Sequence, residues 1–114
     1  MRTGIYLITN TITNKVYVGS AVNIDLRWKE HLNDLRKNKH HSIKLQRAFA
    51  KYGETNFIFD VIMLCDKLEL IVNEQTFINQ FESYKKGYNS CPIAGSRLGS
   101  KQSEETKNKI RAKL

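Results

Sequence analysis

Apolar and polar residues alternate at the start of the chain, and two short runs there predict a β-hairpin. The runs 5–8 and 15–19 are rich in β-branched and aromatic residues, and the polar stretch 9–14 between them suits a turn. Because successive strand residues point to opposite faces, Tyr6 and Tyr17 lie apart from the aliphatic residues that face a core. The two tyrosines are either ordinary half-buried strand residues or the floor of a catalytic site.

Beyond the hairpin, apolar residues recur at helical spacing and predict two helices. Asn23 caps the first, which runs to about residue 37, and Ser42 caps the second, which ends at Gly53. In the first helix Arg27 and His31 are four residues apart, so they share a face beside the apolar stripe rather than within it. They are either surface residues or a pair that works at a site near the hairpin.

A continuous apolar run and a third helix follow. Residues 57–65 are apolar at odd and even positions, which predicts a strand covered on both faces near the middle of a small sheet. Asp66 caps a helix over about 67–82, and Glu74 falls within its apolar stripe. A carboxylate on such a line is costly unless it is paired, protonated or bound to a cation. A pair with Arg27 is one interpretation, and a metal ligand is the one we favour.

Length and composition indicate one folded domain. The chain has 114 residues, 40% of them hydrophobic, which suffices for a single core. There is no apolar run long enough for a membrane span. Cys65 and Cys91 stand alone, so a zinc site is not expected, whereas a disulfide stays open. We expect no membrane partner and a cytoplasmic protein of phage or bacterial type.

Positive charge points to a polyanionic partner. The net charge is +8, and residues 35–53 carry six Lys or Arg and no acidic residue. Residues 93–114 carry six Lys or Arg against two Glu. A charged stretch can also be a solvated face, so charge alone does not establish nucleic-acid binding.

The hairpin carries a more specific signal. Gly4-Ile5-Tyr6, followed about ten residues later by Tyr17-Val18-Gly19, resembles the defining motif of the GIY-YIG nuclease family. The site residues Arg27, His31, Glu74 and Asn89 also fall where that family's motifs place them. Within the family, the chain looks most like phage-type intron-encoded homing endonucleases.

The resemblance implies a fold, a domain organisation and a reaction. The fold is a small α/β (α+β) domain, a three-stranded antiparallel sheet flanked by helices, with the site on one sheet face. The catalytic domain is expected over 1–92, and 93–114 resembles a linker and the start of a modular DNA-binding element. The reaction is metal-dependent hydrolysis of a phosphodiester in double-stranded DNA. Because the final helix has little to pack on, we expect the chain to be a fragment of a longer protein. For the oligomeric state we favour a monomer.

Two residues are assigned to the metal and the phosphate under this resemblance. Glu74 would hold one divalent ion, Mg²⁺ or Mn²⁺, since the motif offers a single carboxylate. Arg27 would hold the scissile phosphate, because a guanidinium matches two phosphate oxygens.

The remaining site residues would transfer protons or position the water and the phosphate. Tyr6 is the expected general base, with Tyr17 orienting the water or the phosphate. Because a phenol has a pKa of about 10, that base needs its pKa lowered by a cation. His31 would assist the proton transfer or bind a phosphate oxygen, and Asn89 would be a positioning residue.

DNA contacts are expected from the basic stretches. They are His40, Lys44 and Arg47 in the domain, and Lys101, Lys107 and Lys109 in the tail.

Other functions stay open. A repair-type nicking nuclease or a restriction enzyme would use the same site, and a non-catalytic DNA-binding module would keep only the fold. A basic RNA-associated protein ranks last, because the chain lacks the aromatic signature of an RNA-binding module.

Overall fold

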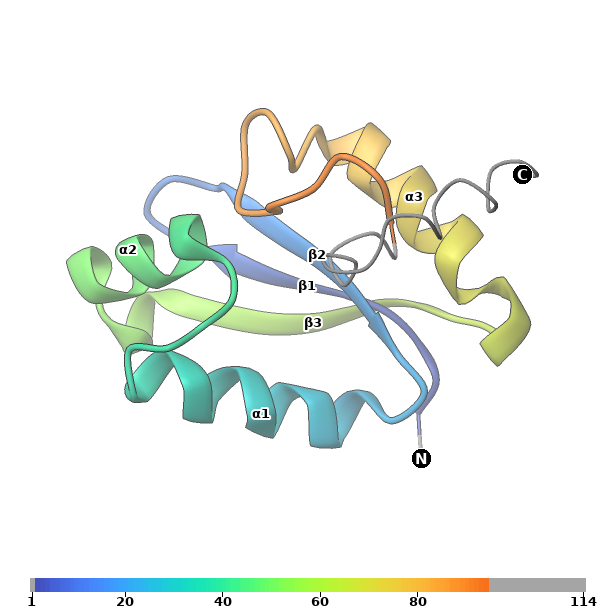
Figure 1. The fold of residues 1–114 in the computed structure, drawn as a ribbon, viewed down its shortest axis with the longest axis horizontal. Helices are drawn as coiled ribbons and strands as arrows, with labels where there is room; N and C mark the ends of the chain where they lie inside the picture. Colours follow the sequence, from blue (N-terminus) through green and yellow to red (C-terminus); the bar gives the residue numbers. More distant parts are fainter. Residues whose placement is uncertain (1, 95–114) are drawn as a thin grey trace, which may run out of the picture.

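Three antiparallel strands form the centre of the molecule, in the order β2-β1-β3 (Figure 1). They are β1 (Gly4–Asn10), β2 (Val16–Ala21) and β3 (Phe57–Leu64). The computed structural model describes residues 2–94, so the predicted linker and final helix over 95–114 lie outside the described residues. The strand order and the antiparallel pairing confirm the predicted three-stranded sheet.

The predicted position of the third strand is wrong. β1 is central and pairs with both neighbours, whereas β3 is an edge strand. The apolar run suggested cover on both faces, but Ile58 is 46% exposed and Leu64 is 63% exposed. An apolar run shows only which residues a strand contains. Whether its two faces are buried depends on the helices and strands that lie next to it.

Helices cover both faces of the sheet, so the domain has three layers (Figure 1). Helix α1 (Ile24–Arg36) and helix α2 (Ile43–Tyr52) lie on one face, and helix α3 (Leu70–Phe81) lies on the other. Short 3-10 turns precede β3 (Glu54–Asn56) and α3 (Lys67–Glu69).

The predicted ends at Asn23, Ser42 and Gly53 are confirmed by the capping contacts, whereas Asp66 caps the 3-10 turn that precedes α3. The Asn23 side chain accepts from the backbone N–H of Leu26, and Ser42 accepts from that of Leu45. Gly53 ends α2 with φ 89°, a conformation that glycine adopts readily.

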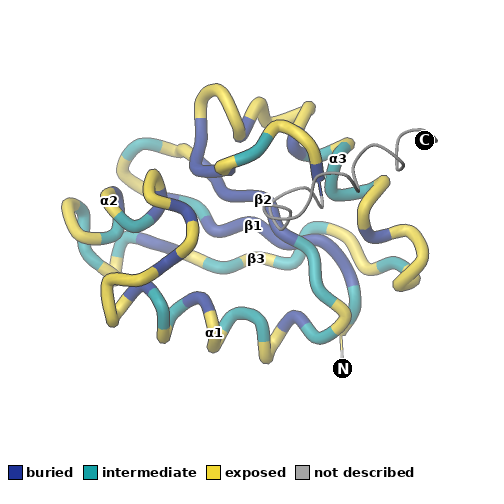
Figure 2. Tube along the Cα trace, viewed as in Figure 1, coloured by how far each residue is buried: buried dark blue, intermediate teal, exposed yellow. Residues whose placement is uncertain are grey.

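Two apolar clusters hold the layers together. Tyr6, Ile8 and Tyr17 pack toward α1 and α2. The residues of the hairpin that pack toward α3 are Ile5, Leu7, Val16 and Val18. This is the alternation predicted from the sequence. Figure 2 shows that burial concentrates along β1 and the facing parts of β2.

In the described part of the chain, no helix has the length and apolar character that crossing a membrane requires.

Candidate active site

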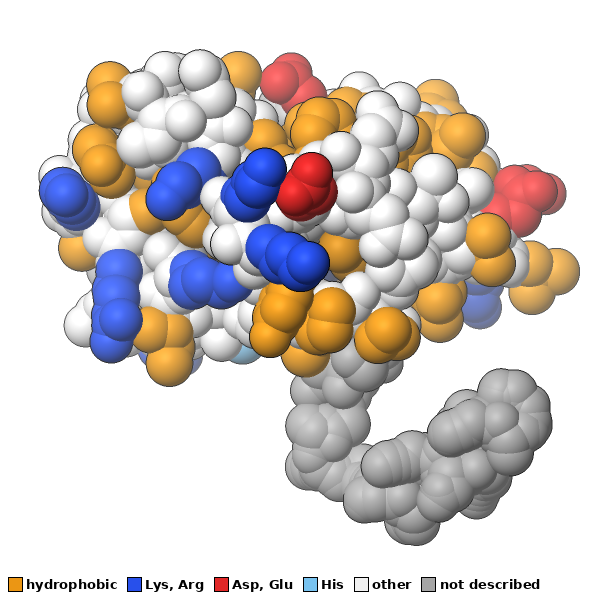
Figure 3. Space-filling view, turned by 90° about the horizontal axis from the view of Figure 1, so that it is seen from above, with side chains coloured by type: hydrophobic (Ala, Val, Ile, Leu, Met, Phe, Trp, Pro, Cys, Tyr) orange, Lys and Arg blue, Asp and Glu red, His pale blue; other side chains and the backbone are white. Residues whose placement is uncertain are grey.

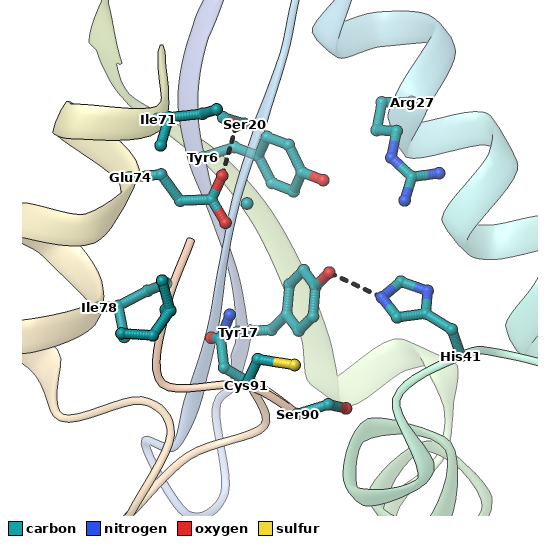
Figure 4. A pocket seen from close by; sticks show the side chains of 13 residues that line it. Tyr6, Tyr17, Ser20, Arg27, His41, Ile71, Glu74, Ile78, Ser90 and Cys91 are labelled. Atoms are coloured by element: carbon teal, nitrogen blue, oxygen red, sulfur yellow. Dashed lines mark hydrogen bonds between the residues drawn. The ribbon is translucent and has the colours of Figure 1, made fainter. Parts of the chain in front are cut away.

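A pocket of about 330 Å³ opens at the free edge of β2. Tyr6, Tyr17 and Arg27 line it from the side of α1, and Glu74 lines it from α3 (Figure 4). The resemblance had implied a site on one sheet face. Because β2 is an edge strand, side chains from both faces reach the pocket around it.

Tyr6 lies at the base of the pocket, with only 1% of the residue exposed. Its hydroxyl oxygen is 2.6 Å from Nε2 of His31, and its ring packs edge-on against Trp28. Burial raises the pKa of Tyr6 well above its ordinary value, and the nearby charge of Arg27 opposes that shift only in part. The predicted general base therefore has a pKa shifted away from what that role needs.

His31 lies on the interior side of Tyr6 and contacts its hydroxyl. It is 1% exposed and belongs to the buried face of α1, so the prediction that it lies beside the apolar stripe is wrong. Its Nδ1 is 2.7 Å from Nε2 of His40, and the two rings stack. Burial lowers the pKa of His31 to about 2 and that of His40 to about 4, which keeps both rings neutral near neutral pH.

His40 is 6% exposed. The sequence predicted a DNA contact for this residue, but its ring lies inside the domain and connects α1 to the start of α2. The structure thus places His40 behind the site rather than on a DNA-facing surface.

His41 is a residue that sequence reasoning missed. Its side chain is exposed, its Nε2 is 3.0 Å from the Tyr17 hydroxyl, and it lines the pocket (Figure 4). The ring also stacks on His40 with the centroids 4.4 Å apart. His40 and His41 are consecutive, and only the structure shows that the first ring turns inward and the second outward.

Arg27 enters the pocket from α1 on the same side as the tyrosine hydroxyls (Figure 4). Its side chain is 28% exposed and forms a salt bridge of 3.1 Å with Glu30. A half-buried guanidinium beside two phenols is suited to hold an anion, because solvent screens it less than a surface charge.

Glu74 reaches the pocket from α3 and accepts a 2.5 Å hydrogen bond from the Ser20 hydroxyl. Among the ion pairs of the described residues, Arg27 contacts Glu30 from its own helix. In the described residues no group of three His, Cys, Asp or Glu is arranged to hold a metal. One oriented carboxylate still fits Mg²⁺, which proteins often hold by one or two carboxylates together with water and substrate phosphates.

Asn89 clamps the edge of β2. Its side-chain oxygen accepts from the Val18 N–H at 2.8 Å, and its side-chain nitrogen donates to the Val18 carbonyl at 3.0 Å. One amide thus satisfies both edge groups of that residue. Next to it, the Tyr88 N–H donates to the Val16 carbonyl.

On the face seen in Figure 3, most of the basic side chains gather on one side. Lys44 and Arg47 are exposed on α2, and Lys44 donates to the Tyr84 carbonyl. Burial lowers the pKa of Lys44, and the positive charge of Lys15 lowers it further. The predicted tail contacts Lys101, Lys107 and Lys109 lie outside the described residues.

The sequence itself matches the GIY-YIG catalytic domain over residues 2–89. The chain belongs to the GIY-YIG family. Its relatives include "Intron-associated endonuclease 1" of Enterobacteria phage T4, 45% identical over 103 residues, which cover 87% of this chain and 40% of that protein. "Probable intron-encoded endonuclease 1" of Neurospora crassa is 39% identical, over 94% of this chain and 36% of its own length.

Solved structures agree with this family. The catalytic domain of the homing endonuclease I-TevI is 42% identical and superimposes with a TM-score of 0.75, over 79% of this chain and 99% of that one. A mutant of the same catalytic domain gives a TM-score of 0.77, over 82% and 98%. The chain spans about two fifths of the length of the curated relatives. GIY-YIG nucleases generally depend on a divalent metal ion.

Proposed function

We propose that this chain is the catalytic domain of a homing-type endonuclease that hydrolyses phosphodiester bonds in double-stranded DNA. The observation that carries the proposal is the pocket at the β2 edge, where a carboxylate from one sheet face meets two phenols and a guanidinium from the other. The relatives, which are intron-associated and intron-encoded endonucleases by name, support the homing class.

Glu74 is the proposed holder of a single Mg²⁺ or Mn²⁺ ion. Its hydrogen bond from Ser20 fixes one carboxylate oxygen and turns the group toward the pocket (Figure 4). The bound ion would supply Lewis-acid stabilisation of charge on the phosphate oxygens. Ser20 is then the positioning residue of this ligand, a role in which hydrogen bonds to a carboxylate are commonly found.

Arg27 is the proposed phosphate-binding residue. Two N–H groups of its guanidinium can donate to two phosphate oxygens, and the positive charge favours the extra negative charge that develops in the transition state. Its half-buried position makes this contribution larger than a surface arginine would give.

His31 and Asn89 act from behind the reacting groups in this proposal. His31 holds the Tyr6 hydroxyl, and Asn89 holds the part of β2 between Tyr17 and Gly19. Lys44 and Arg47 are proposed to contact DNA phosphates outside the pocket, where lysine and arginine give affinity without reading bases.

Cleavage of supercoiled plasmid tests the function. We expect nicking or linearisation with Mg²⁺, none with EDTA, and none with the Glu74→Ala variant. The matched control is Asp60→Asn, which removes an exposed carboxylate of β3 that does not line the pocket. Low salt is used because phosphate contacts are strongest there.

The same experiment addresses the competing function. DNA binding without new DNA ends, at high protein concentration and low salt, would indicate a non-catalytic module. Cleavage of only one DNA strand would indicate a repair-type nicking activity.

A further inference from the structure

Two of the three histidine rings beside the pocket, those of His40 and His31, have hydrogen bonds whose direction follows from one backbone group. The Ser42 N–H donates to Nδ1 of His40 at 3.0 Å. A backbone N–H can only donate, so Nδ1 of His40 carries no hydrogen. In a neutral ring the hydrogen is then on Nε2.

This hydrogen fixes the next ring as well. Nε2 of His40 donates to Nδ1 of His31 at 2.7 Å, so His31 also carries its hydrogen on Nε2. Nε2 of His31 therefore donates to the Tyr6 oxygen at 2.6 Å. The lowered pKa of each histidine agrees with one hydrogen per ring.

On its interior side, the Tyr6 oxygen thus accepts a hydrogen bond from His31. His31 cannot take its proton, and the hydrogen of the Tyr6 hydroxyl has to point away from His31. Because Tyr6 lines the pocket, that hydrogen is available to a group bound there. Because burial raises the pKa of Tyr6, the phenol stays protonated at neutral pH, which is the form that a proton donor needs and a base does not have.

The other tyrosine has a partner of a different kind. His41 is exposed, stacks on His40 and places Nε2 at 3.0 Å from the Tyr17 hydroxyl. It does not belong to the directed series of bonds that begins at Ser42. An exposed imidazole can also return a proton to solvent.

We propose that the two tyrosine–histidine pairs work in opposite directions: Tyr6, held by His31, donates a proton in the pocket, and His41 accepts the proton of Tyr17. The inference rests on the proposed nuclease function. It makes His41 a positioning and proton-accepting partner of Tyr17, and it transfers the base role from Tyr6 to the Tyr17–His41 pair.

The proton balance of the step is simple. The Tyr17 oxygen takes a proton from the attacking water while the Tyr17 hydroxyl proton moves to Nε2 of His41. The water oxygen forms the new bond to phosphorus. The bond to the leaving oxygen breaks with its electron pair, and the Tyr6 hydroxyl supplies the proton to that oxygen. His41 then releases its proton to solvent, and Tyr6 recovers one.

The hydrogen positions can be measured without any cleavage. The chain has three histidines, so a long-range ¹H–¹⁵N correlation spectrum at about pH 8.5, above the ordinary histidine pKa, contains only six ring nitrogens. We expect hydrogen on Nε2 of His31 and His40, and on Nδ1 of His41. Hydrogen on Nδ1 of His31, or on Nε2 of His41, would overturn the proposal while leaving the nuclease function intact.

Variants test the proton transfer itself. His41→Gln keeps an acceptor near the Nε2 position but cannot take a proton, and His41→Ala removes both. We expect each to slow plasmid cleavage at least about tenfold and to remove the rise of rate with pH that an imidazole base gives. Lys39→Ala, an exposed neighbouring change, is the control and should leave the rate unchanged. Full activity of His41→Gln would reduce His41 to a structural hydrogen-bond partner and contradict the proposal.

The pH profile depends on the groups around His41. Among the described residues these include the hydrogen-bonded Tyr17, the neighbouring rings of His40 and His31, and Tyr6, Arg27, Glu74 and Cys91, which line the same pocket. Because the buried histidines stay neutral to well below pH 6, a dependence of the rate on pH above that range that His41→Gln removes belongs to His41.

Discussion

Gly19 lies directly opposite Tyr6 in the β1–β2 ladder, and the Tyr6 ring occupies the space that a Cβ atom at position 19 would need. The close approach lets the phenol lie over the backbone of the neighbouring strand and reach His31. The glycine of the second half of the motif is thus required by the tyrosine of the first half.

Replacing this glycine should displace the tyrosine. We expect Gly19→Ala to cost about 1–3 kcal/mol of unfolding free energy through overpacking. Cleavage should fall at least about tenfold, because a small displacement of a reacting group is expensive. Urea denaturation and plasmid cleavage measure the two effects.

Gly53→Ala separates stability from site geometry. It also destabilises the fold, because φ is 89° at the end of α2, but nothing in the pocket contacts it. If both variants lost stability and cleavage in proportion, the Tyr6 contact would have no special role.

Arg27 should be replaceable by neither alanine nor lysine. We expect Arg27→Ala to lower kcat about 10²-fold through lost transition-state stabilisation, and Arg27→Lys to recover only part of this, because a lysine cannot donate to two oxygens in a fixed plane. Single-turnover cleavage measures the chemical step. Glu30→Ala removes only the exposed salt-bridge partner and should change the rate by no more than about twofold.

The buried histidines should make the fold sensitive to mild acid. Their pKa falls from the ordinary 6.5 to about 2 for His31 and about 4 for His40, so between these values the unfolded chain binds protons that the folded chain does not. This contribution is fully present above pH 6.5 and is lost as the pH falls below it. From about pH 7 to pH 5 we expect a loss on the order of 2 kcal/mol for each histidine.

Urea denaturation over that range is the measurement. The exposed carboxyls Asp25 and Glu54, whose pKa values are lowered by arginine partners, lose their stabilising effect only at still lower pH. Equal stability at pH 7 and pH 5 would mean that the two rings are accessible to protons in the folded state.

Asn89 should matter for stability more than a typical loop asparagine. Asn89→Ala leaves the N–H and carbonyl of Val18 without partners at a buried edge, which costs about 1–3 kcal/mol. Asn79→Ala, an exposed asparagine of α3, is the control for thermal unfolding and should be close to neutral. Equal effects would show that water replaces the Asn89 amide.

Much of the fold follows from local sequence signals, because those signals act over a few residues. Asn23, Ser42 and Gly53 mark helix ends through contacts with their own neighbours, and the alternation around Tyr6 and Tyr17 sets the two sheet faces. Strand order is different. It depends on contacts between distant segments, and the apolar composition of residues 57–65 could not reveal that β3 lies at an edge.

For the site, too, the sequence predicted the residues that local motifs mark but not the contacts between distant segments. Residue types at motif spacing predicted Tyr6, Tyr17, Arg27 and Glu74, and the structure brings all four to one pocket. The roles of consecutive histidines were not readable, because the inward turn of His40 and the outward turn of His41 depend on how α2 begins against α1. Nor could the sequence show that Ser20 holds Glu74, since the two are 54 residues apart.

The hydrogen bond between Ser20 and Glu74 gives a last prediction, on metal dependence. Ser20→Ala removes the donor that orients the carboxylate but leaves the carboxylate in place. Since hydrogen-bonding partners of a metal ligand typically contribute about 10–100-fold in metal affinity, we expect the Mg²⁺ concentration for half-maximal cleavage to rise by about tenfold, with the maximal rate nearly kept. Glu74→Gln, which keeps the shape but loses the charge, should not be rescued by any Mg²⁺ concentration. A Ser20→Ala variant whose maximal rate falls while its Mg²⁺ requirement stays the same would place Ser20 on the substrate instead of the ligand.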